Sequence, residues 1–340
     1  MEVLVKTGLA DMLPKLPTLR RHLNQIKNLD KDEPTPTVKQ LTELHIRRQS
    51  LSPHTAKAYR SKIKRFVEFQ GSDLPVDEIT EDQLIAFKEH ILKSCTATTF
   101  NTLRRHLQVI FMLAVKEKHI YASPLGEIAQ ARVPKVPPKA VPQDLLTLVT
   151  TYLKQSRDRF TEPPWYWLTV IAVFYYTGMR RRQLAGLRWA DLDFTEGLIH
   201  LSATYSKNLR EWRVPMPGQV QPLLLDLREA TLKRVHVINP SDPVFNLTLF
   251  APRVTGVWSM ERSVEQLSRF FKKLMKRTGV EISPHRLRHT AGTEYMRLTR
   301  DPKTVQMLLG HSKLDTTMQY NHPTLEDVRT LMARLKHGPI

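Results

Sequence analysis

Four short stretches of this chain carry side chains that could do chemistry, and each also has a plainer structural interpretation. In the first, an apolar run ends at Gly178 and Arg180 follows two residues later. Glycine permits a tight backbone turn, which would hold Arg180 close to the end of the buried run. Taken alone, this pattern is more typical of a basic surface corner.

The second stretch is HRLRH, which begins at His285 and follows a Ser-Pro pair typical of a helix start. At positions i, i+3 and i+4, the side chains of His285, Arg288 and His289 share one helix face. A histidine pair at this spacing could bind zinc, but Arg286 stands where the HExxH motif has its glutamate. We therefore expect no metal site here.

The remaining two stretches are the Gly310-His311 pair and the tyrosine at position 320. Gly310 lies where a helix C-cap residue is expected, and a lone histidine after it usually caps or packs. A tyrosine among helical residues more often packs at the edge of a core than acts as a nucleophile. None of the four stretches establishes a function alone.

The order and spacing of these residues change that interpretation. In chain order, an arginine follows a glycine turn and Lys207 lies near a predicted hairpin turn. A His-x-x-Arg motif and a Gly-His pair come next, and a tyrosine follows nine residues after that last histidine. This series resembles the tyrosine recombinase (lambda integrase) family, most closely its simple Xer-type site-specific recombinases and integrases. The stretches that carry the resemblance are TGMRRRQLAGLRWADLD, SKNLREWRVPM, HRLRHTAGTEYM and LLGHSKLDTTMQYNH.

The resemblance covers residues 140–340 and implies a set of catalytic residues. These are Arg180, Lys207, His285, Arg288, His311 and the nucleophile Tyr320. The two arginines would clamp a phosphate, Lys207 would be the general acid, and His285 would take the tyrosine proton or assist its transfer. The family often has an acidic residue three positions after the first arginine. Here that residue is Gln183, which can form hydrogen bonds but adds no charge.

The implied reaction is phosphoryl transfer without a metal, a cofactor or ATP. The tyrosine oxygen would attack a DNA phosphodiester, form a 3′-phosphotyrosyl bond and release a 5′-hydroxyl. Two guanidinium groups would neutralise the charge that magnesium neutralises in metal-dependent enzymes. A hydroxyl from a different strand could then reverse the step. The implied function is site-specific recombination, with DNA integration, excision or resolution as the outcome.

The composition favours a nucleic-acid-binding protein. Lys and Arg number 52 against 33 Asp and Glu, and the net charge of +19 implies a polyanionic partner, with an anionic membrane surface as the weaker choice. The longest apolar run, Trp165–Tyr176, is too short to span a bilayer, and the first residues lack a signal-peptide pattern. The single cysteine, Cys95, excludes an internal disulfide framework. We expect a cytoplasmic, nucleoid-associated protein that binds double-stranded DNA and no membrane.

We expect two domains, because 340 residues exceed what one compact core usually holds. Residues 132–142 are rich in proline and basic side chains, which predicts a semi-rigid linker. It separates a helical segment at 37–131 from a mixed segment at 143–340, and residues 1–36 form an N-terminal extension. By resemblance to the family, 37–131 is the core-binding (DNA-binding) domain and 143–340 is the catalytic domain. The predicted fold is a mainly α N-terminal domain plus an α+β catalytic domain with a small antiparallel sheet.

Capping signals and periodicity predict the individual elements. Ser52 before a proline begins one helix, Thr80 with Gln83 as a capping box begins a second, and Phe100–Ala114 is a third. In the catalytic segment we expect helices at 143–154, 165–177, 218–235, 262–277, 284–298, 302–309 and 324–336, and strands at 194–203 and 212–216.

Basic side chains on the first helices and in the linker predict a DNA-binding surface, although solvated helix faces would have the same pattern. The predicted residues are Lys57, Arg60, Lys64, Arg65, Arg104, Arg105, Arg132, Lys135 and Lys139. By resemblance, the apolar face of the tail helix 324–336 would dock on a neighbouring protomer in a tetramer on synapsed DNA. The need for an accessory or partner recombinase is left open.

Two other functions stay open on the sequence alone. A type IB-like topoisomerase uses similar chemistry but rejoins the same strand, and sequence-independent relaxation of DNA would favour it. A non-catalytic DNA-binding protein would retain these residues without using them. Gln183 is the only feature that supports this last alternative.

Overall fold

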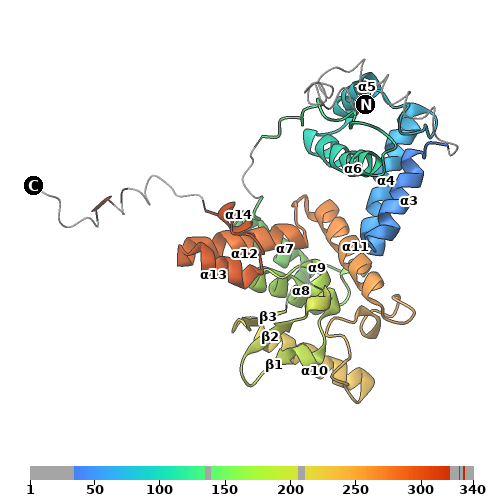
Figure 1. Ribbon diagram of the computed structural model, residues 1–340. Coiled ribbons are helices and arrows are strands. Elements are labelled where there is room, and N and C mark those ends of the chain that lie inside the picture. The colour runs from blue at the N-terminus through green and yellow to red at the C-terminus, as the bar shows by residue number, and fades with distance from the viewer. Residues whose placement is uncertain (1–33, 135–138, 206–210, 322–328, 330–331, 334–340) are drawn as a thin grey trace, which may run out of the picture. The chain divides into compact units, whose positions relative to one another are not determined.

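The chain divides into two compact units, Met1–Lys135 and Val136–Ile340, as a computed structural model shows (Figure 1). The structure describes residues 34–134, 139–205, 211–321, 329, 332 and 333. The division falls inside the proline-rich segment 132–142, where missing backbone donors and restricted backbone angles disfavour regular structure.

The described part of the first unit is helical. Its helices are α3 (Val38–Arg48), α4 (Pro53–Gln70), α5 (Glu81–Ser94) and α6 (Ala97–Lys116). The caps that the sequence predicts are confirmed: Ser52 Oγ accepts a hydrogen bond from the Thr55 amide, and Thr80 and Gln83 form a capping box. Helix α3, which periodicity alone did not single out, begins with a similar box between Thr37 and Gln40.

The core of this first unit combines aliphatic side chains with four phenylalanines. Phe66, Phe87, Phe100 and Phe111 are among its largest fully buried side chains. The rings of Phe66 and Phe87 meet edge to face with centroids 5.1 Å apart, an arrangement that adds to the gain from burial. Because each helix buries one face here, its charged residues are left on the outer face.

The second unit combines helices with a small antiparallel sheet, which confirms the predicted fold class. Its elements are α7 (Gln143–Gln155), α8 (Pro164–Thr177), α9 (Arg181–Gly186), β1 (Leu192–Asp193), β2 (Leu198–Leu201), β3 (Trp212–Pro215), α10 (Gln221–Val235), α11 (Met260–Thr278), α12 (Pro284–Thr299), α13 (Pro302–Leu309) and α14 (Asp315–Met318). The helices expected between residues 143 and 309 are therefore confirmed. The predicted tail helix 324–336 lies outside the described residues except for 329, 332 and 333.

One sequence prediction is wrong in this unit, since residues 194–203 do not form a single strand. Residues 194–197 form a turn between β1 and β2. The Asp193 carboxylate accepts hydrogen bonds from the amides of Thr195 and Glu196, and Gly197 has a φ of +63°. These local bonds outweigh the extended preference of the segment. In the three-stranded sheet, Ile199 of β2 pairs with Leu192 of β1 and with Val214 of β3.

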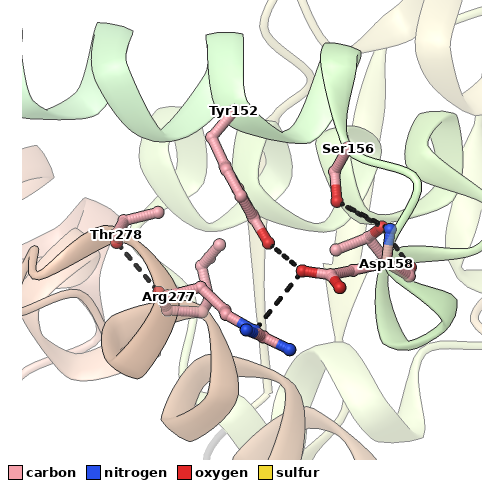
Figure 2. Close-up of polar contacts among 7 residues, drawn as sticks. Tyr152, Ser156, Asp158, Arg277 and Thr278 are labelled. Atoms are coloured by element: carbon pink, nitrogen blue, oxygen red, sulfur yellow. Dashed lines mark hydrogen bonds and ion pairs between the residues drawn. The ribbon is translucent and has the colours of Figure 1, made fainter.

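Helix α8 lies at the centre of the second unit and is mostly buried. It packs against α12 along its length, and its Trp167 stacks on Phe270 of α11 with centroids 3.7 Å apart. A polar network fastens the far end of α11 to α7 (Figure 2). There the Tyr152 hydroxyl donates to Asp158, and Arg277 Nε lies 3.4 Å from the same carboxylate oxygen. Helix α8 thus contacts both α11 and α12, and α11 is also bonded to the end of α7.

Among the described residues, no helix is long and apolar enough to cross a membrane.

Candidate active site

Arg288 lies at the centre of the site and forms hydrogen bonds to the C-terminal ends of two helices, α8 and α13. Helix α12 begins after Ser283, whose hydroxyl accepts from the Arg286 amide, and this places Arg288 one turn into the helix. Arg288 is 5% exposed. Its Nη1 donates to the carbonyl of Gly178 at 2.6 Å, and its Nη2 donates to that of Leu309 at 2.7 Å. The carbonyls at helix C-termini carry partial negative charge, so the guanidinium is stabilised where α8 and α13 end.

Gly178 makes this arrangement possible for two reasons. Its φ is +62°, the left-handed conformation in which side chains other than glycine are strained. A Cβ added at this position would also lie 2.6 Å from Leu309 Cδ2. The glycine turn that the sequence associates with Arg180 therefore also permits the close approach of α13 and the anchoring of Arg288.

Arg180 is held by the first turn of α9. Its backbone amide donates to Gln183 Oε1 at 2.7 Å, and its Nη2 donates to the carbonyl of Gly310 at 3.2 Å. Gln183 is 2% exposed, so an amide at this position positions Arg180 without placing a carboxylate in the interior. Arg180 Nη1 is buried and has no hydrogen-bond partner among the described residues.

Arg180 and Arg288 line a cavity of about 360 Å³ together with His285, Arg181, Ser283 and Pro284. Burial lowers the pKa of Arg180, and burial together with the charge of Arg180 lowers the pKa of Arg288 to about 9. Arg288 therefore remains cationic at neutral pH, and a guanidinium such as that of Arg180 does not lose its proton in proteins. Two like charges beside one cavity repel each other, and an anion bound there would relieve that repulsion. The site has the charge and donors to hold a phosphoryl group.

Tyr320 lies just after α14 and packs against α12. It is 3% exposed, and its amide donates to the carbonyl of Thr317. Its hydroxyl lies 3.1 Å from Nδ1 of His289. Burial raises the pKa of the Tyr320 phenol, while the charges of Arg288 and Arg180 act in the opposite direction. The phenol therefore needs a proton acceptor to become a nucleophile at neutral pH.

His311 is a buried neutral imidazole beside this tyrosine. Its Nδ1 is 2.8 Å from Thr317 Oγ1, and its ring lies nearly parallel to that of Tyr320 with centroids 6.2 Å apart. Burial and the charges of Arg288 and Arg180 lower the pKa of His311 to about 4. At neutral pH this side chain can donate one hydrogen bond but carries no charge.

His285 lines the cavity but does not contact Tyr320 directly in any described hydrogen bond. Its Nε2 lies 2.9 Å from Nε2 of His289, and His289 in turn reaches the Tyr320 hydroxyl. On the sequence alone, His289 was considered only as a zinc ligand, and its contact with Tyr320 was not predicted. The i, i+4 spacing of His285 and His289 was the one sequence feature that indicated that these two side chains lie together. Among the described residues, no group of three or more His, Cys, Asp or Glu side chains could hold a metal ion.

Lys207, the expected general acid, lies in the segment 206–210, outside the described residues. The neighbouring strand β3 begins at Trp212, whose ring packs directly over Gly310. The structure thus brings together five of the six expected catalytic residues, namely Arg180, His285, Arg288, His311 and Tyr320.

The basic residues expected to contact DNA have different environments. Lys57 and Arg105 are exposed in the first unit. Arg60 pairs with Glu43 at 2.7 Å, and Lys64 lies 3.5 Å from Glu68. Exposed ion pairs of this kind contribute little to stability, so a phosphate could replace either carboxylate.

The other basic residues are bound to protein atoms or lie near the linker. Arg65 donates to Cys95 Sγ at 3.0 Å. Arg104 donates to the carbonyls of Ile128 and Leu125, so its guanidinium fastens the segment after α6. Arg132 and Lys139 are exposed, whereas Lys135 lies outside the described residues.

A helical unit is followed by an α+β unit in which two arginines and a histidine line one cavity, and a second histidine connects that cavity to a buried tyrosine. This is the arrangement of a tyrosine recombinase. Comparison with known proteins agrees. Residues 149–326, more than half of the chain, match the phage integrase family, and residues 39–120 match the phage integrase N-terminal SAM-like domain. The chain belongs to the phage integrase family.

The curated relatives that this chain resembles are named as tyrosine recombinases. A putative tyrosine recombinase XerC of Pseudomonas syringae is 30% identical over 308 residues, which cover 87% of this chain and 63% of the relative. The chain therefore spans less than two thirds of that relative. The tyrosine recombinase XerC of Chlamydia caviae is 28% identical over 310 residues, with 82% of this chain and 91% of the relative covered.

Solved structures confirm the fold. The Tn1549 transposon integrase, solved with transposon right end DNA, is 20% identical with a TM-score of 0.66, over 89% of this chain and 100% of that one. A lambda integrase dimer bound to a core site is 19% identical with a TM-score of 0.65, over 84% and 96% of the two chains.

Proposed function

We propose that this protein is a site-specific DNA recombinase in which Tyr320 is the nucleophile. Its phenolic oxygen attacks a phosphodiester, forms a 3′-phosphotyrosyl bond and releases a 5′-hydroxyl. The observation that carries the proposal is the cavity lined by the buried Arg288 and the half-buried Arg180, next to the two histidines that connect it to Tyr320.

The two arginines have different tasks in this mechanism. Arg288 is anchored to two carbonyls and serves as a fixed positive charge, and Arg180 offers the unused donor Nη1. Together they stabilise the charge that develops on the non-bridging oxygens of the transition state. Neutral His311 adds one hydrogen bond without increasing the repulsion between cations.

The leaving 5′-oxygen requires a proton, and we assign this step to Lys207 on the segment between β2 and β3. The covalent intermediate conserves the energy of the phosphodiester. The 5′-hydroxyl of another strand can therefore displace Tyr320 and complete strand exchange without ATP.

We further propose that the protein acts on double-stranded DNA as a tetramer at the nucleoid. A lambda integrase of similar fold is a tetramer bound to a Holliday junction. In the proposed organisation, residues 37–131 bind DNA, 132–142 link the domains, 143–340 carry out catalysis, and the tail helix 324–336 docks on a neighbouring protomer. Exposed Lys57, Arg105, Arg132 and Lys139 are the best candidates for phosphate contacts, and such binding should weaken steeply with salt.

Covalent capture tests this proposal. The protein is mixed with fragmented host DNA and denatured, and only DNA that remains attached to protein is sequenced, with Tyr320→Phe as the matched control. We expect one or a few inverted-repeat sites with the wild type and none with the variant. Tyrosine-dependent capture without a preferred site would indicate a topoisomerase instead. Salt-sensitive binding without any covalent product would indicate a non-catalytic DNA-binding protein.

A further inference from the structure

A continuous line of hydrogen-bond contacts connects the nucleophile to the cavity. The Tyr320 hydroxyl is 3.1 Å from Nδ1 of His289, and Nε2 of His289 is 2.9 Å from Nε2 of His285. The two histidines are four residues apart on α12, and His285 lines the cavity with the two arginines. His289 is thus the only described imidazole that touches both the phenol and a second base.

The Nε2–Nε2 contact restricts where the hydrogen atoms can be. Two bare nitrogens would repel each other, so one of the two Nε2 atoms must carry a hydrogen and the other must accept it. If His289 donates there, its Nδ1 is bare and accepts from the Tyr320 hydroxyl. If His285 donates, His289 Nδ1 carries the hydrogen and donates to the phenolic oxygen. Only the first arrangement lets the phenol lose its proton.

We propose that His289 is a catalytic residue that accepts the Tyr320 proton at Nδ1 and passes its own Nε2 proton to Nε2 of His285. This inference rests on the proposed function and adds a residue to it. One proton enters His289 as another leaves, so His289 ends neutral in its other tautomer. His285 becomes an imidazolium, and Tyr320 becomes the phenolate that forms the bond to phosphorus.

The surroundings explain why the proton should move on from His289. Burial, together with His285, Arg288 and Arg286, lowers the pKa of His289 to about 4, so a positive charge on this ring would be poorly tolerated. Burial and the charge of Arg288 lower the pKa of His285 as well, but His285 is more exposed and lines the cavity, where a bound phosphate would stabilise its imidazolium. The relay therefore moves the positive charge from a position where it is disfavoured to one beside the substrate's negative charge.

The test measures formation of the covalent adduct in a single turnover on the captured DNA site. We expect His289→Gln and His289→Ala to slow this step by about 100-fold or more, the usual contribution of a positioned base. His236→Asn, an exposed substitution at the C-cap of α10, is the matched control and should react at the wild-type rate. Circular dichroism and DNA affinity confirm that each variant is folded.

Two further measurements separate a proton acceptor from a merely structural residue. The rate of His289→Ala should rise about tenfold per pH unit in mildly alkaline solution, because the phenol must then ionise without help. Replacing Tyr320 with 3,5-difluorotyrosine, whose phenol is more acidic, should restore much of the rate of His289→Ala. If His289→Ala only damaged the structure, neither higher pH nor the fluorinated tyrosine would restore the rate.

The outcomes distinguish this inference from the function on which it rests. A wild-type rate for His289→Ala, with an adduct that still requires Tyr320, would overturn the relay and leave the recombinase function intact. Loss of rate without any rescue by pH or fluorination would also overturn the relay. Absence of an adduct from the wild type would overturn both. Because the two histidines act in one path, the double variant His285→Gln/His289→Gln should be no slower than the slower single variant, whereas multiplied effects would show separate roles.

Discussion

The ring of Tyr320 rests directly on the backbone of α12 at Gly292. A Cβ added to Gly292 would lie 2.8 Å from two ring carbons of Tyr320, closer than real Cβ contacts allow. Tyr320, the proposed nucleophile, can therefore lie against α12, within reach of His289, because this helical position has no side chain.

Gly292→Ala should slow covalent attachment to DNA while leaving the fold intact. The new methyl group must displace the Tyr320 ring, and a misplacement of this size in an active site costs about 100-fold in rate. Alanine also favours the helix by ~1 kcal/mol, which offsets part of the strain. Single-turnover cleavage and urea denaturation measure the two effects. Gly218→Ala, where an added Cβ meets nothing within 4 Å, is the control, and equal rates for both variants would contradict the packing argument.

Arg288→Lys should lower both stability and activity. The ammonium group cannot reproduce the two hydrogen bonds to the carbonyls of Gly178 and Leu309, and buried bonds from a charged donor contribute about 1.5–3 kcal/mol each. We expect the free energy of unfolding to fall by roughly 2–3 kcal/mol in urea denaturation.

Arg180→Lys should lower cleavage activity while leaving stability nearly unchanged. Its guanidinium makes one bond of 3.2 Å to the protein and otherwise offers the free donor Nη1, so stability should change little. Cleavage should nevertheless fall severely, because a lysine cannot present the forked donors to a phosphate. Equal losses of stability in Arg180→Lys and Arg288→Lys would contradict this division of roles.

Gln183→Leu should impair cleavage, whereas Gln183→Glu should preserve it. The leucine removes the acceptor for the Arg180 amide and leaves a buried N–H unpaired, at a cost of about 1–3 kcal/mol. The glutamate retains the acceptor and adds a negative charge close to Arg180. Cleavage rates and urea denaturation of the pair test this, and an inactive Gln183→Glu would mean that the uncharged amide itself is required.

Stability should decrease as the pH falls from about 6.5 toward about 4. The pKa values of His289 and His311 are both lowered to about 4 in the folded protein, against an ordinary value near 6.5. Between these values the unfolded chain binds more protons than the folded one, so falling pH favours unfolding. Thermal unfolding midpoints measured across this range check the direction. The slope should be shallower in His289→Gln, and an unchanged slope would mean that His289 is not held neutral.

Lys207→Ala should be rescued by a DNA substrate whose leaving oxygen is replaced by sulfur. A 5′-thiolate leaves without a proton, so the general acid becomes unnecessary. Cleavage of the ordinary substrate should fall by at least ~100-fold and that of the sulfur-containing substrate should be near the wild-type rate. If the sulfur substrate is cleaved no faster, the acid is another residue.

The sequence by itself determined the features that depend on residues close together along the chain. Ser52, Thr80 and Ser283 act as helix caps because each needs only an amide three residues away, and the structure contains all three helices. The order of the arginines, histidines and tyrosine likewise identifies the family without coordinates, because it is a property of the chain.

Tertiary structure decided which of these residues meet. Arg288 bonds to a carbonyl 110 positions earlier in the chain, and His289 reaches a hydroxyl 31 positions later. Helical spacing reveals which side chains share a face of α12. It does not reveal which other segment packs there, because that depends on how α8, α13 and the chain around Tyr320 fill the space together. Only this packing places His289, which its spacing from His285 suggested as a zinc ligand, between Tyr320 and the cavity that His285 lines.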